Sequence, residues 1–354
     1  MPGEETGNYP PPARLSHSHR NPGCKGSETG VVKGMNLLEV MRSLGSEEEC
    51  FAFLEGMRWP EGVRCAVCGC DRISRITRKS ATKNVRKSLY QCLEPTCKQQ
   101  FSVTSGTVFH DSRIPLTTWF LAIQLIMEAK KGMSAMQLKR SLWGDHKGSY
   151  QTAWYMCHRI REAMAKPSEA KALLGGSIEM DETLLGGYAK GKGPQGYSHR
   201  IKETVLGIKQ KNGELRFFHI EDVKSGTLAK YIKENVSGDV DVVVTDEAGG
   251  YPKAFIEAGI HGSKHKRVNH SKGVFVDGDV TTNGVESAFS LLKRGIVGSY
   301  HKISAKHLSR YLSEFEYRFN ERKSETRFED LVKRAGAASP LPYAKLTFDP
   351  EDVF

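Results

Sequence analysis

The chain has 354 residues, with 52 lysines and arginines against 41 aspartates and glutamates, so its formal net charge is +11. This length allows two or three domains, and the charge favours a polyanionic partner such as nucleic acid or an anionic membrane surface. No apolar run could span a bilayer and no signal-peptide pattern opens the chain. We therefore expect a cytoplasmic protein whose eight cysteines are thiols or metal ligands rather than disulfides.

The N-terminal stretch 1–34 is rich in glycine, proline, serine and charged residues, and we expect it to be a disordered extension. Met35 opens a more regular stretch and is a candidate for the true start of the protein. We predict a helical lead-in and a zinc ribbon in 35–110.

Two cysteine pairs carry the ribbon prediction. Cys65 and Cys68 form a C-x2-C knuckle, and Cys92 and Cys97 form a C-x4-C pair that begins after 23 intervening residues. Four thiolates in two pairs predict a structural, tetrahedral Zn²⁺ site, and zinc would supply folding energy that so small a module lacks. We expect the other cysteines to bind no metal, with Cys70 a spare for Cys68: Cys24, Cys50, Cys70 and Cys157. Basic residues around the pairs suit phosphate contacts: Arg72, Arg75, Arg78, Lys79, Lys83, Arg86 and Lys87.

Residues 111–168 have the pattern of a helix-turn-helix domain, with two helices joined by the turn "WGDHKG". Residues near the start of the second helix are expected to meet bases or phosphates of DNA, and two arginines further along to reach the DNA backbone: Ser149, Gln151, Thr152, Arg159 and Arg161. The apolar side chains of this helix are expected to face the core: Ala153, Trp154, Cys157 and Ile160. The same spacing also fits an ordinary helix bundle; the preceding basic ribbon favours DNA binding.

Two apolar strands end in acids that are followed by glycines. Asp181 ends the apolar part of "SIEMDETLLGG", and Asp246 follows "DVVVT" 65 residues later. Glu286 comes another 40 residues on, in the predicted helix "NGVESAFSLLKRGIVG", and Lys293 lies two helical turns after it. The apolar stripe of this helix would hold Glu286 at the edge of a face packed on the sheet: Val285, Phe289, Leu292 and Ile296.

A cluster of three carboxylates repels itself unless a cation compensates it. All-oxygen ligands select Mg²⁺ or Mn²⁺, and two such ions can activate a water or a DNA 3′-hydroxyl for attack on a phosphodiester. Lys293 would then hold a DNA phosphate. Any one of these acids alone is better explained as a solvated loop carboxylate, and the prediction rests on the set. The cationic segments "AKGKGPQGYSHRIK" and "HGSKHKRVNHSK" either contact DNA or are ordinary solvated loops.

These motifs, taken together and in this order, resemble prokaryotic insertion-sequence transposases of the ISXO type. The resemblance covers roughly 35–330, and its matching stretches are "RWPEGVRCAVCG", "QLKRSLWGDHKGSYQTAWYMCHRIREAM", "IEMDETLLGG", "VVVTDEAGGY", "TTNGVESAFSLLKRGIVGSYHKIS" and "HLSRYLSEFEYRFNER". It implies a multidomain α+β protein in which the zinc ribbon and helix-turn-helix precede an α/β ribonuclease-H-like DDE domain, a mixed sheet with flanking helices. We place that domain in 174–325, closed by two helices, and a C-terminal tail in 326–354.

The resemblance also implies site residues. Asp181, Asp246 and Glu286 would bind two catalytic ions, Mg²⁺ or Mn²⁺, and Lys293 would contact transposon-end DNA. Some relatives have asparagine as the third member, so Asn283, one turn before Glu286, is the reserve; it is otherwise a candidate N-cap. The histidine expected just before that asparagine is replaced by threonine at 281 and 282.

The predicted function is that of a DNA transposase that binds terminal inverted repeats and cuts and joins double-stranded DNA. By analogy we expect a nucleoid-associated homodimer or higher assembly on DNA, because two ends must be held together. Two alternatives stay open. One is a non-catalytic DNA-binding regulator derived from a transposase, and the other is a metal-dependent nuclease of the same fold.

Overall fold

The computed structural model describes most of the chain after residue 33. The described residues are 34–76, 89–166, 171–186, 188–189, 199–200, 202–246, 249–268 and 281–348. Two expectations lie wholly or mainly outside them, the disordered extension and the basic loop of the ribbon, and so does the basic segment 189–202 after Asp181. The basic segment after Asp246 is described as far as residue 268, where it forms a 3₁₀ turn and a strand rather than only a loop. Within the described ranges, no helix has both the length and the apolar character needed to cross a membrane.

Two capped helices, α1 (Leu37–Ser43) and α2 (Glu47–Arg58), lead into the ribbon. Each begins with a capping box, in which the side chain of the N-cap residue and that of a glutamate three positions later satisfy each other's backbone N–H groups. The two pairs are Asn36 with Glu39 and Ser46 with Glu49. The boxes explain why such short segments begin where they do.

The ribbon is a three-stranded antiparallel sheet in the order β1-β2-β3. Its strands are β1 (Ile73–Ile76), β2 (Leu89–Cys92) and β3 (Gln100–Ser102). Its own core is small: the rings of Tyr90 and Phe101 stack with centroids 5.5 Å apart, and Trp59 meets both edge-on. A core of this size leaves the module dependent on further cross-links.

A bundle of helices follows the ribbon and shares one hydrophobic core with α1 and α2. Its members are α3 (Leu116–Glu128), α4 (Ala135–Trp143), α5 (Tyr150–Met164) and, from the C-terminal region, α10 (Arg327–Ala337). The expected helix pair is therefore present as α4 and α5. The turn between them needs glycine at Gly148, where φ is +70° and an added Cβ would lie 2.6 Å from the ring of Trp143.

The expectation of a plain C-terminal tail in 326–354 is corrected by α10 and by a short helix α11 (Tyr343–Thr347). The buried side chains of α10 recur at helical spacing and complete the bundle core: Phe328, Leu331, Val332 and Ala335. The same periodicity was present in the sequence, so the two predicted closing helices are not the last elements of the chain.

A five-stranded mixed sheet forms the second part, in the order β10-β9-β4-β7-β8. Its strands are β4 (Ser177–Leu185), β7 (Glu203–Gln210), β8 (Leu215–Ile220), β9 (Val242–Thr245) and β10 (His265–Arg267). The pairs among β4, β7 and β8 are antiparallel, whereas β4, β9 and β10 run parallel. A two-stranded ribbon, β5 (Tyr188–Ala189) with β6 (His199–Arg200), stands apart from this sheet. The predicted mixed sheet with flanking helices is confirmed.

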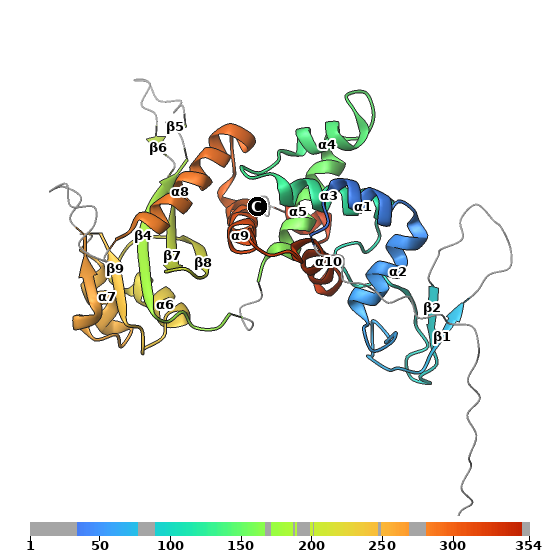
Figure 1. Cartoon of the computed structure of the whole chain (residues 1–354), viewed down its shortest axis with the longest axis horizontal. Coiled ribbons are helices and arrows are strands. Elements are labelled where there is room, and N and C mark those ends of the chain that lie inside the picture. The colour runs from blue at the N-terminus through green and yellow to red at the C-terminus, as the bar shows by residue number, and fades with distance from the viewer. Residues whose placement is uncertain are drawn as a thin grey trace, which may run out of the picture. The chain divides into compact units, whose positions relative to one another are not determined.

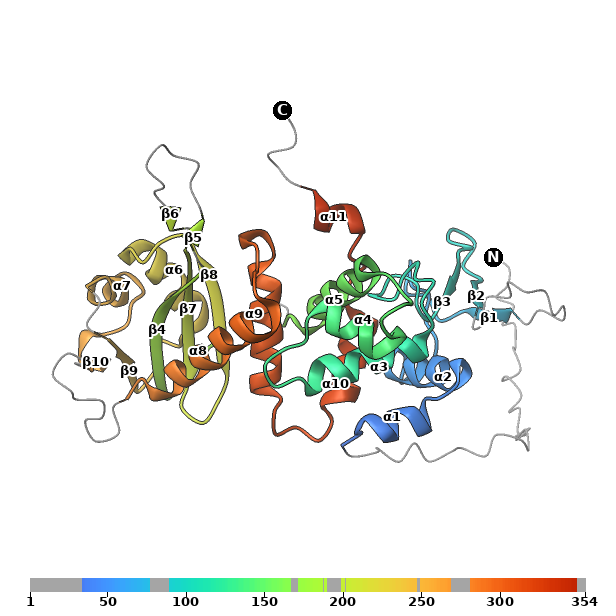
Figure 2. The same ribbon diagram turned by 90° about the horizontal axis from the view of Figure 1, so that it is seen from above.

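Helices cover both faces of the sheet (Figure 1). On one face, α6 (Ser225–Asn235) and α7 (Tyr251–Glu257) pack on inward-pointing residues such as Ile178 and Met180. On the other face, α8 (Asn283–Gly295) and α9 (Ala305–Asn320) pack on residues such as Leu185 and Val205 (Figure 2). Alternate residues of each strand thus pack against the helices on opposite faces of the sheet. Asp181, in phase with Leu185, belongs to the α8 face.

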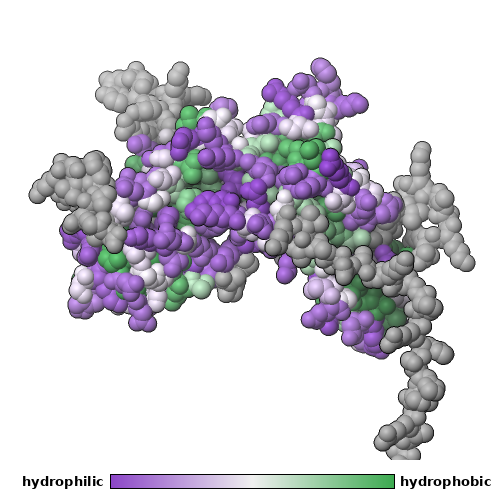
Figure 3. All heavy atoms as spheres, in the orientation of Figure 1, coloured by the Kyte–Doolittle hydropathy of each residue, from purple (hydrophilic) through white to green (hydrophobic). Residues whose placement is uncertain are grey.

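A π-helical turn, Ile296–Tyr300, joins the end of α8 to the segment before α9. α9 is amphipathic, with Leu308, Leu312 and Phe315 buried and Lys306 exposed. Hydrophilic side chains accordingly gather over this helix in the space-filling view (Figure 3). A short 3₁₀ turn, Gly262–Lys264, precedes β10.

Candidate metal sites and nucleic-acid interface

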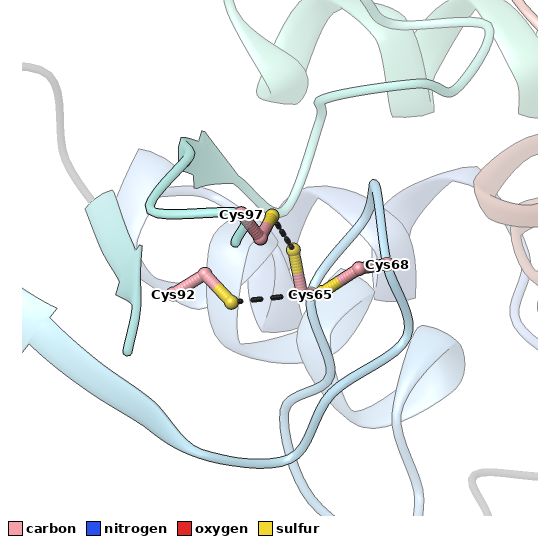
Figure 4. Close-up of side chains that lie close together, drawn as sticks. All are labelled: Cys65, Cys68, Cys92 and Cys97. Carbon is pink, nitrogen blue, oxygen red and sulfur yellow. Dashed lines mark hydrogen bonds between the residues drawn. The ribbon is translucent and has the colours of Figure 1, made fainter. Parts of the chain in front are cut away.

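The four cysteines of the two predicted pairs come together at one end of the ribbon (Figure 4). Their sulfurs lie within 4.8 Å of one another, with Cys65 Sγ 3.7 Å from Cys97 Sγ and Cys68 Sγ 3.6 Å from Cys92 Sγ. A tetrahedral zinc with Zn–S bonds of about 2.3 Å places its sulfurs about 3.8 Å apart. The donor set and its spacing therefore fit zinc.

Two tight turns hold these thiols. In the first turn Cys65 N–H donates to the carbonyl of Cys70, and Gly69, with φ at +75°, donates back to Cys65. Burial alone would raise the pKa of Cys65, but backbone N–H groups of the knuckle and the neighbouring thiols lower it to about 7. Burial raises the pKa of Cys92 to about 12. Cys70 lies outside the group of four and faces Glu94 instead.

Asp181 and Asp246 meet at the edge of the large sheet because β4 and β9 are parallel. Ser177 pairs with Val242 and Glu179 with Val244, an offset of 65 residues that continues to Asp181 and Asp246. β9 ends at Thr245 while β4 runs on to Leu185, so Asp181 lies beyond the last residue pair of the two strands. Carboxylate oxygens of Asp181, Glu182 and Asp246 lie within 4.8 Å of one another.

Burial and neighbouring like charges both act on the acid cluster, defined as Asp181, Glu182 and Asp246. Burial and then the charges of Asp246, Glu182 and Glu286 raise the pKa of Asp181 to about 7. Burial also raises the pKa of Glu182, although the hydroxyl of Tyr251 donates to its Oε2 at 2.6 Å and works against that rise. Ligands of an octahedral ion at about 2.1 Å are about 3.0 to 4.2 Å apart. Three carboxylates at this spacing fit a hard divalent cation.

Glu286 lies next to the acid cluster rather than within it. It is half-buried in the first turn of α8, accepts a hydrogen bond from the Thr282 hydroxyl at 2.6 Å, and contributes to the pKa of Asp181. The suggestion that Asn283 is the N-cap is corrected: Thr282 takes that position, and Asn283 is the exposed first residue of the helix. Lys293 is exposed on the same helix, two turns beyond Glu286.

Glu182 had no role in the sequence-based prediction. Neighbouring residues of a strand point to opposite faces, so Asp181 and Glu182 were not expected to converge. At Asp181 and Glu182, β4 is paired with β7 on one side only, because its pairing with β9 ends at Glu179. On the unpaired side the two side chains can approach the same carboxylate of Asp246. The sequence held one sign of a role for Glu182. Tyr251, a hydrogen-bond donor, comes five residues after Asp246 at the start of α7, and its hydroxyl donates to Glu182.

The predicted DNA-reading residues lie at the start of α5. Ser149 caps this helix by accepting from Gln151 N–H at 3.2 Å; Ser149 and Gln151 are exposed and Thr152 is half-buried. The Gln151 amide nitrogen is within hydrogen-bonding distance of the Tyr343 hydroxyl of α11. Of the side chains expected in the core, Trp154 alone is only half-buried.

The two arginines expected to reach the DNA backbone do not face solvent, which corrects that prediction. Arg159 is 3% exposed, donates to the carbonyl of His110 at 2.6 Å, and lies over the rings of Trp119 and Tyr155. Arg161 is 1% exposed and forms an ion pair of 2.6 Å with Glu314 of α9. The second half of α5 is enclosed by other helices, so its cations serve packing.

Comparison with known proteins agrees with this architecture. Residues 173–320 match the model of an ISXO2-like transposase domain, and residues 45–100 match that of a transposase zinc-ribbon domain. The chain is also 25% identical over 299 residues to a protein of Halobacterium salinarum described as an uncharacterized protein in transposable element ISH50. That similarity spans 78% of this chain and 92% of the relative. The chain therefore belongs to the insertion-sequence transposases that combine a zinc ribbon with an ISXO2-like DDE transposase domain.

Proposed function

We propose that this protein is a DNA transposase that binds the terminal inverted repeats of an insertion sequence and cleaves and rejoins DNA strands with the help of divalent ions. The observation that carries the proposal is the convergence of Asp181 and Asp246 at one sheet edge, with Glu286 beside them, in a chain of this family. Mutually repelling, partly buried carboxylates favour a bound cation.

The residues have distinct roles in this proposal. The carboxylates of Asp181, Asp246 and Glu286 hold two ions, Mg²⁺ or Mn²⁺, and Glu182 adds negative charge beside them; Asn283 is the reserve for Glu286. Such ions, when bound, activate a water or a DNA 3′-hydroxyl and stabilise the leaving oxygen of a phosphodiester. Tyr251 orients Glu182 by its hydrogen bond. Lys293, exposed on α8, holds a phosphate of the transposon end.

DNA recognition is assigned to two other regions. The ribbon, with zinc on Cys65, Cys68, Cys92 and Cys97, presents basic residues to the DNA backbone. The start of α5 brings Ser149, Gln151 and Thr152 to base edges or phosphates, as the second helix of a helix-turn-helix would. Arg159 is omitted because its guanidinium is buried and hydrogen-bonded. Two transposon ends must be held together, so the protein acts as a homodimer or larger assembly on the DNA of the nucleoid.

An assay with paired transposon-end duplexes, a target plasmid and Mg²⁺ tests the proposal. Strand-transfer products are expected. Cleavage without joining would instead support a metal-dependent nuclease of the same fold, and retarded but intact DNA would support a non-catalytic regulator. Either of these two results, obtained with protein that binds the ends, would contradict the transposase proposal.

A further inference from the structure

Glu179, also on β4, has a carboxylate that is not part of the acid cluster but lies two residues before Asp181. Glu179 is only 5% exposed, in a strand that is paired on both sides at this position, with Val244 on β9 and Lys209 on β7. Its Oε2 accepts the backbone N–H of Val285 at 2.8 Å. A carboxylate buried this deeply needs such a partner, and here the partner is the first turn of α8.

The side chains that satisfy the first N–H groups of α8 lie outside its N-cap position, and the hydroxyl oxygen of Thr281 accepts from Asn283 N–H at 3.0 Å. The N-cap residue Thr282 accepts no capping hydrogen bond on its side chain, and the Thr282 hydroxyl donates to Glu286. The first N–H groups of a helix are otherwise unsatisfied, and they carry a partial positive charge that favours a carboxylate. Glu179 therefore supplies, from a neighbouring strand, the acceptor for the N–H of the third residue of α8, Val285.

Two glycines allow this close approach. A Cβ added at Gly284 would lie 2.6 Å from Glu179 Oε2 and 2.8 Å from Oε1, so only glycine leaves room for the carboxylate. On β7, Gly207 pairs with Asp181, and a Cβ there would lie 2.7 Å from a methyl group of Val285 and 2.8 Å from the ring of Phe289. α8 is thus seated on β4 and β7 at short range beside Asp181.

Glu179 contacts or adjoins a residue within two positions of each of the three predicted metal ligands. It precedes Asp181 by two residues, so both side chains belong to the same face of β4. Val244 of β9, the residue that pairs with Glu179 across the sheet, lies two residues before Asp246. The hydrogen bond of Glu179 ends on Val285, the residue directly before Glu286.

We infer that Glu179 is a positioning residue, whose carboxylate fixes the first turn of α8 so that Glu286 is held at the right distance from Asp181 and Asp246. This inference rests on the proposed function, because it presumes that these three acids bind divalent ions together. Residues that orient metal ligands typically change metal affinity or activity by about 10- to 100-fold when removed.

The test compares four variants of the full-length protein. Glu179→Ala removes the acceptor, whereas Glu179→Gln keeps an oxygen that can accept from Val285. Gly284→Ala disturbs the same contact from the helix side. Gly226→Ala is its matched control, because Gly226 is likewise the second residue of a helix, α6, and an added Cβ there meets nothing within 4 Å.

Three readouts are needed: Mn²⁺ affinity by calorimetry, hydrogen exchange of the Val285 and Glu286 amides, and binding of transposon-end DNA. Glu179→Ala and Gly284→Ala should weaken Mn²⁺ binding by about 10- to 100-fold and speed exchange at the two amides, with end binding unchanged. Glu179→Gln should recover most of the Mn²⁺ affinity, and Gly226→Ala should match the wild type.

The outcomes separate this inference from the proposed function. Wild-type Mn²⁺ affinity in Asp181→Asn and Asp246→Asn would defeat the proposed function. Loss in those two variants with wild-type affinity in folded Glu179→Ala and Gly284→Ala would defeat the inference alone. A lower melting temperature without lost Mn²⁺ affinity would mark Glu179 as merely structural and would overturn it, as would Glu179→Gln binding Mn²⁺ no better than Glu179→Ala.

Discussion

Two carboxylate sites in this protein, the buried Glu314 and the half-buried acid cluster, differ in the charges that surround them. Glu314 on α9 is fully buried, yet Arg161 and Arg318 lie 2.6 and 2.7 Å from its oxygens and the Tyr300 hydroxyl donates at 2.6 Å. Burial alone would raise its pKa, but the arginines hold that pKa below the ordinary value. At the sheet edge the neighbours of Asp181 are other acids, and its pKa rises to about 7.

This difference in surrounding charge distinguishes a carboxylate that stabilises the fold from carboxylates that serve a function. A carboxylate compensated by the protein's own cations stabilises the fold, here by linking α5 to α9. A cluster of acids that the fold brings together costs stability and is retained where a cation from solution completes it. We therefore expect the two groups to respond to substitution in opposite ways.

The largest expected effect is on activity at the sheet edge. Asp246→Asn should reduce strand cleavage by roughly 10³-fold or more, because a ligand to the ions is lost. End binding and thermal stability should stay near wild type, since the substitution removes repulsion from Asp181. Gel assays of cleavage and binding, with Asp241→Asn at the exposed start of β9 as the control, test this. Turnover retained by Asp246→Asn would remove this residue from the site.

The converse result is expected for Glu314. Glu314→Gln leaves two buried arginines short of a partner and should lower the free energy of unfolding by about 3–5 kcal/mol. Mn²⁺ affinity of the folded fraction should not change. Urea titrations provide the measurement, and Glu162→Gln, which loses a more exposed pair with Arg310 on the same two helices, should cost about 1 kcal/mol or less. Equal losses of unfolding free energy in Glu314→Gln and Glu162→Gln would show that Glu314 contributes no more to stability than an exposed ion pair does.

The four cysteines of the ribbon are a third kind of cluster, in which the proposed zinc ion would compensate the thiolates and hold the fold together. Cys65→Ser should abolish the zinc content found by elemental analysis and weaken end binding, because the small core of the ribbon cannot hold the strands alone. Cys70→Ser, in the same knuckle, should retain both. Zinc content unchanged in Cys65→Ser would reject the site.

His158, near Glu314, is a buried histidine that is held in its neutral form: within the described residues neither ring nitrogen has a hydrogen-bond partner. Burial, then the charges of Arg161, His307 and Arg310, lower its pKa to about 2. The unfolded chain, with a histidine pKa of about 6.5, then binds the proton more readily, so stability is complete above pH 6.5 and falls below it. From pH 7 to pH 5 His158 should cost about 2 kcal/mol.

Urea titrations at the two pH values check this effect. His158→Phe should lose less stability on acidification than the wild type by about that amount, whereas His146→Phe, at an exposed turn position, should follow the wild type. Parallel pH profiles for wild type and His158→Phe would show that the ring is not held neutral.

The smallest effect is expected at Lys293. Lys293→Ala should weaken binding to transposon ends uniformly across sequences and reduce the slope of log affinity against log salt by about one. Lys233→Ala, exposed on α6 over the other face of the sheet, should leave the slope unchanged. A slope that is the same in Lys293→Ala and wild type would exclude a phosphate contact at this lysine.

Patterns of short range were sufficient for much of the fold and part of the site. Cysteine spacing predicted the four thiols, and apolar runs ending in acids predicted that Asp181 and Asp246 belong to one site. Periodicity could not show which further helices would cover α5, so Arg159 was expected in solvent. The helical periodicity of α10 was present in the sequence but was not interpreted as a helix. Glu179 and Glu182 depend on a helix terminus and a strand edge that form only once distant segments pack.

The central claim is that Asp181, Asp246 and Glu286 share divalent ions against DNA. Anomalous diffraction from crystals of the protein with a transposon-end duplex and Mn²⁺ tests it most directly. The account predicts Mn²⁺ peaks about 2.2 Å from carboxylate oxygens of Asp181 and Asp246, with Glu286 or Asn283 completing the coordination. Ordered DNA with no manganese at these oxygens, or with manganese bound elsewhere, would contradict it.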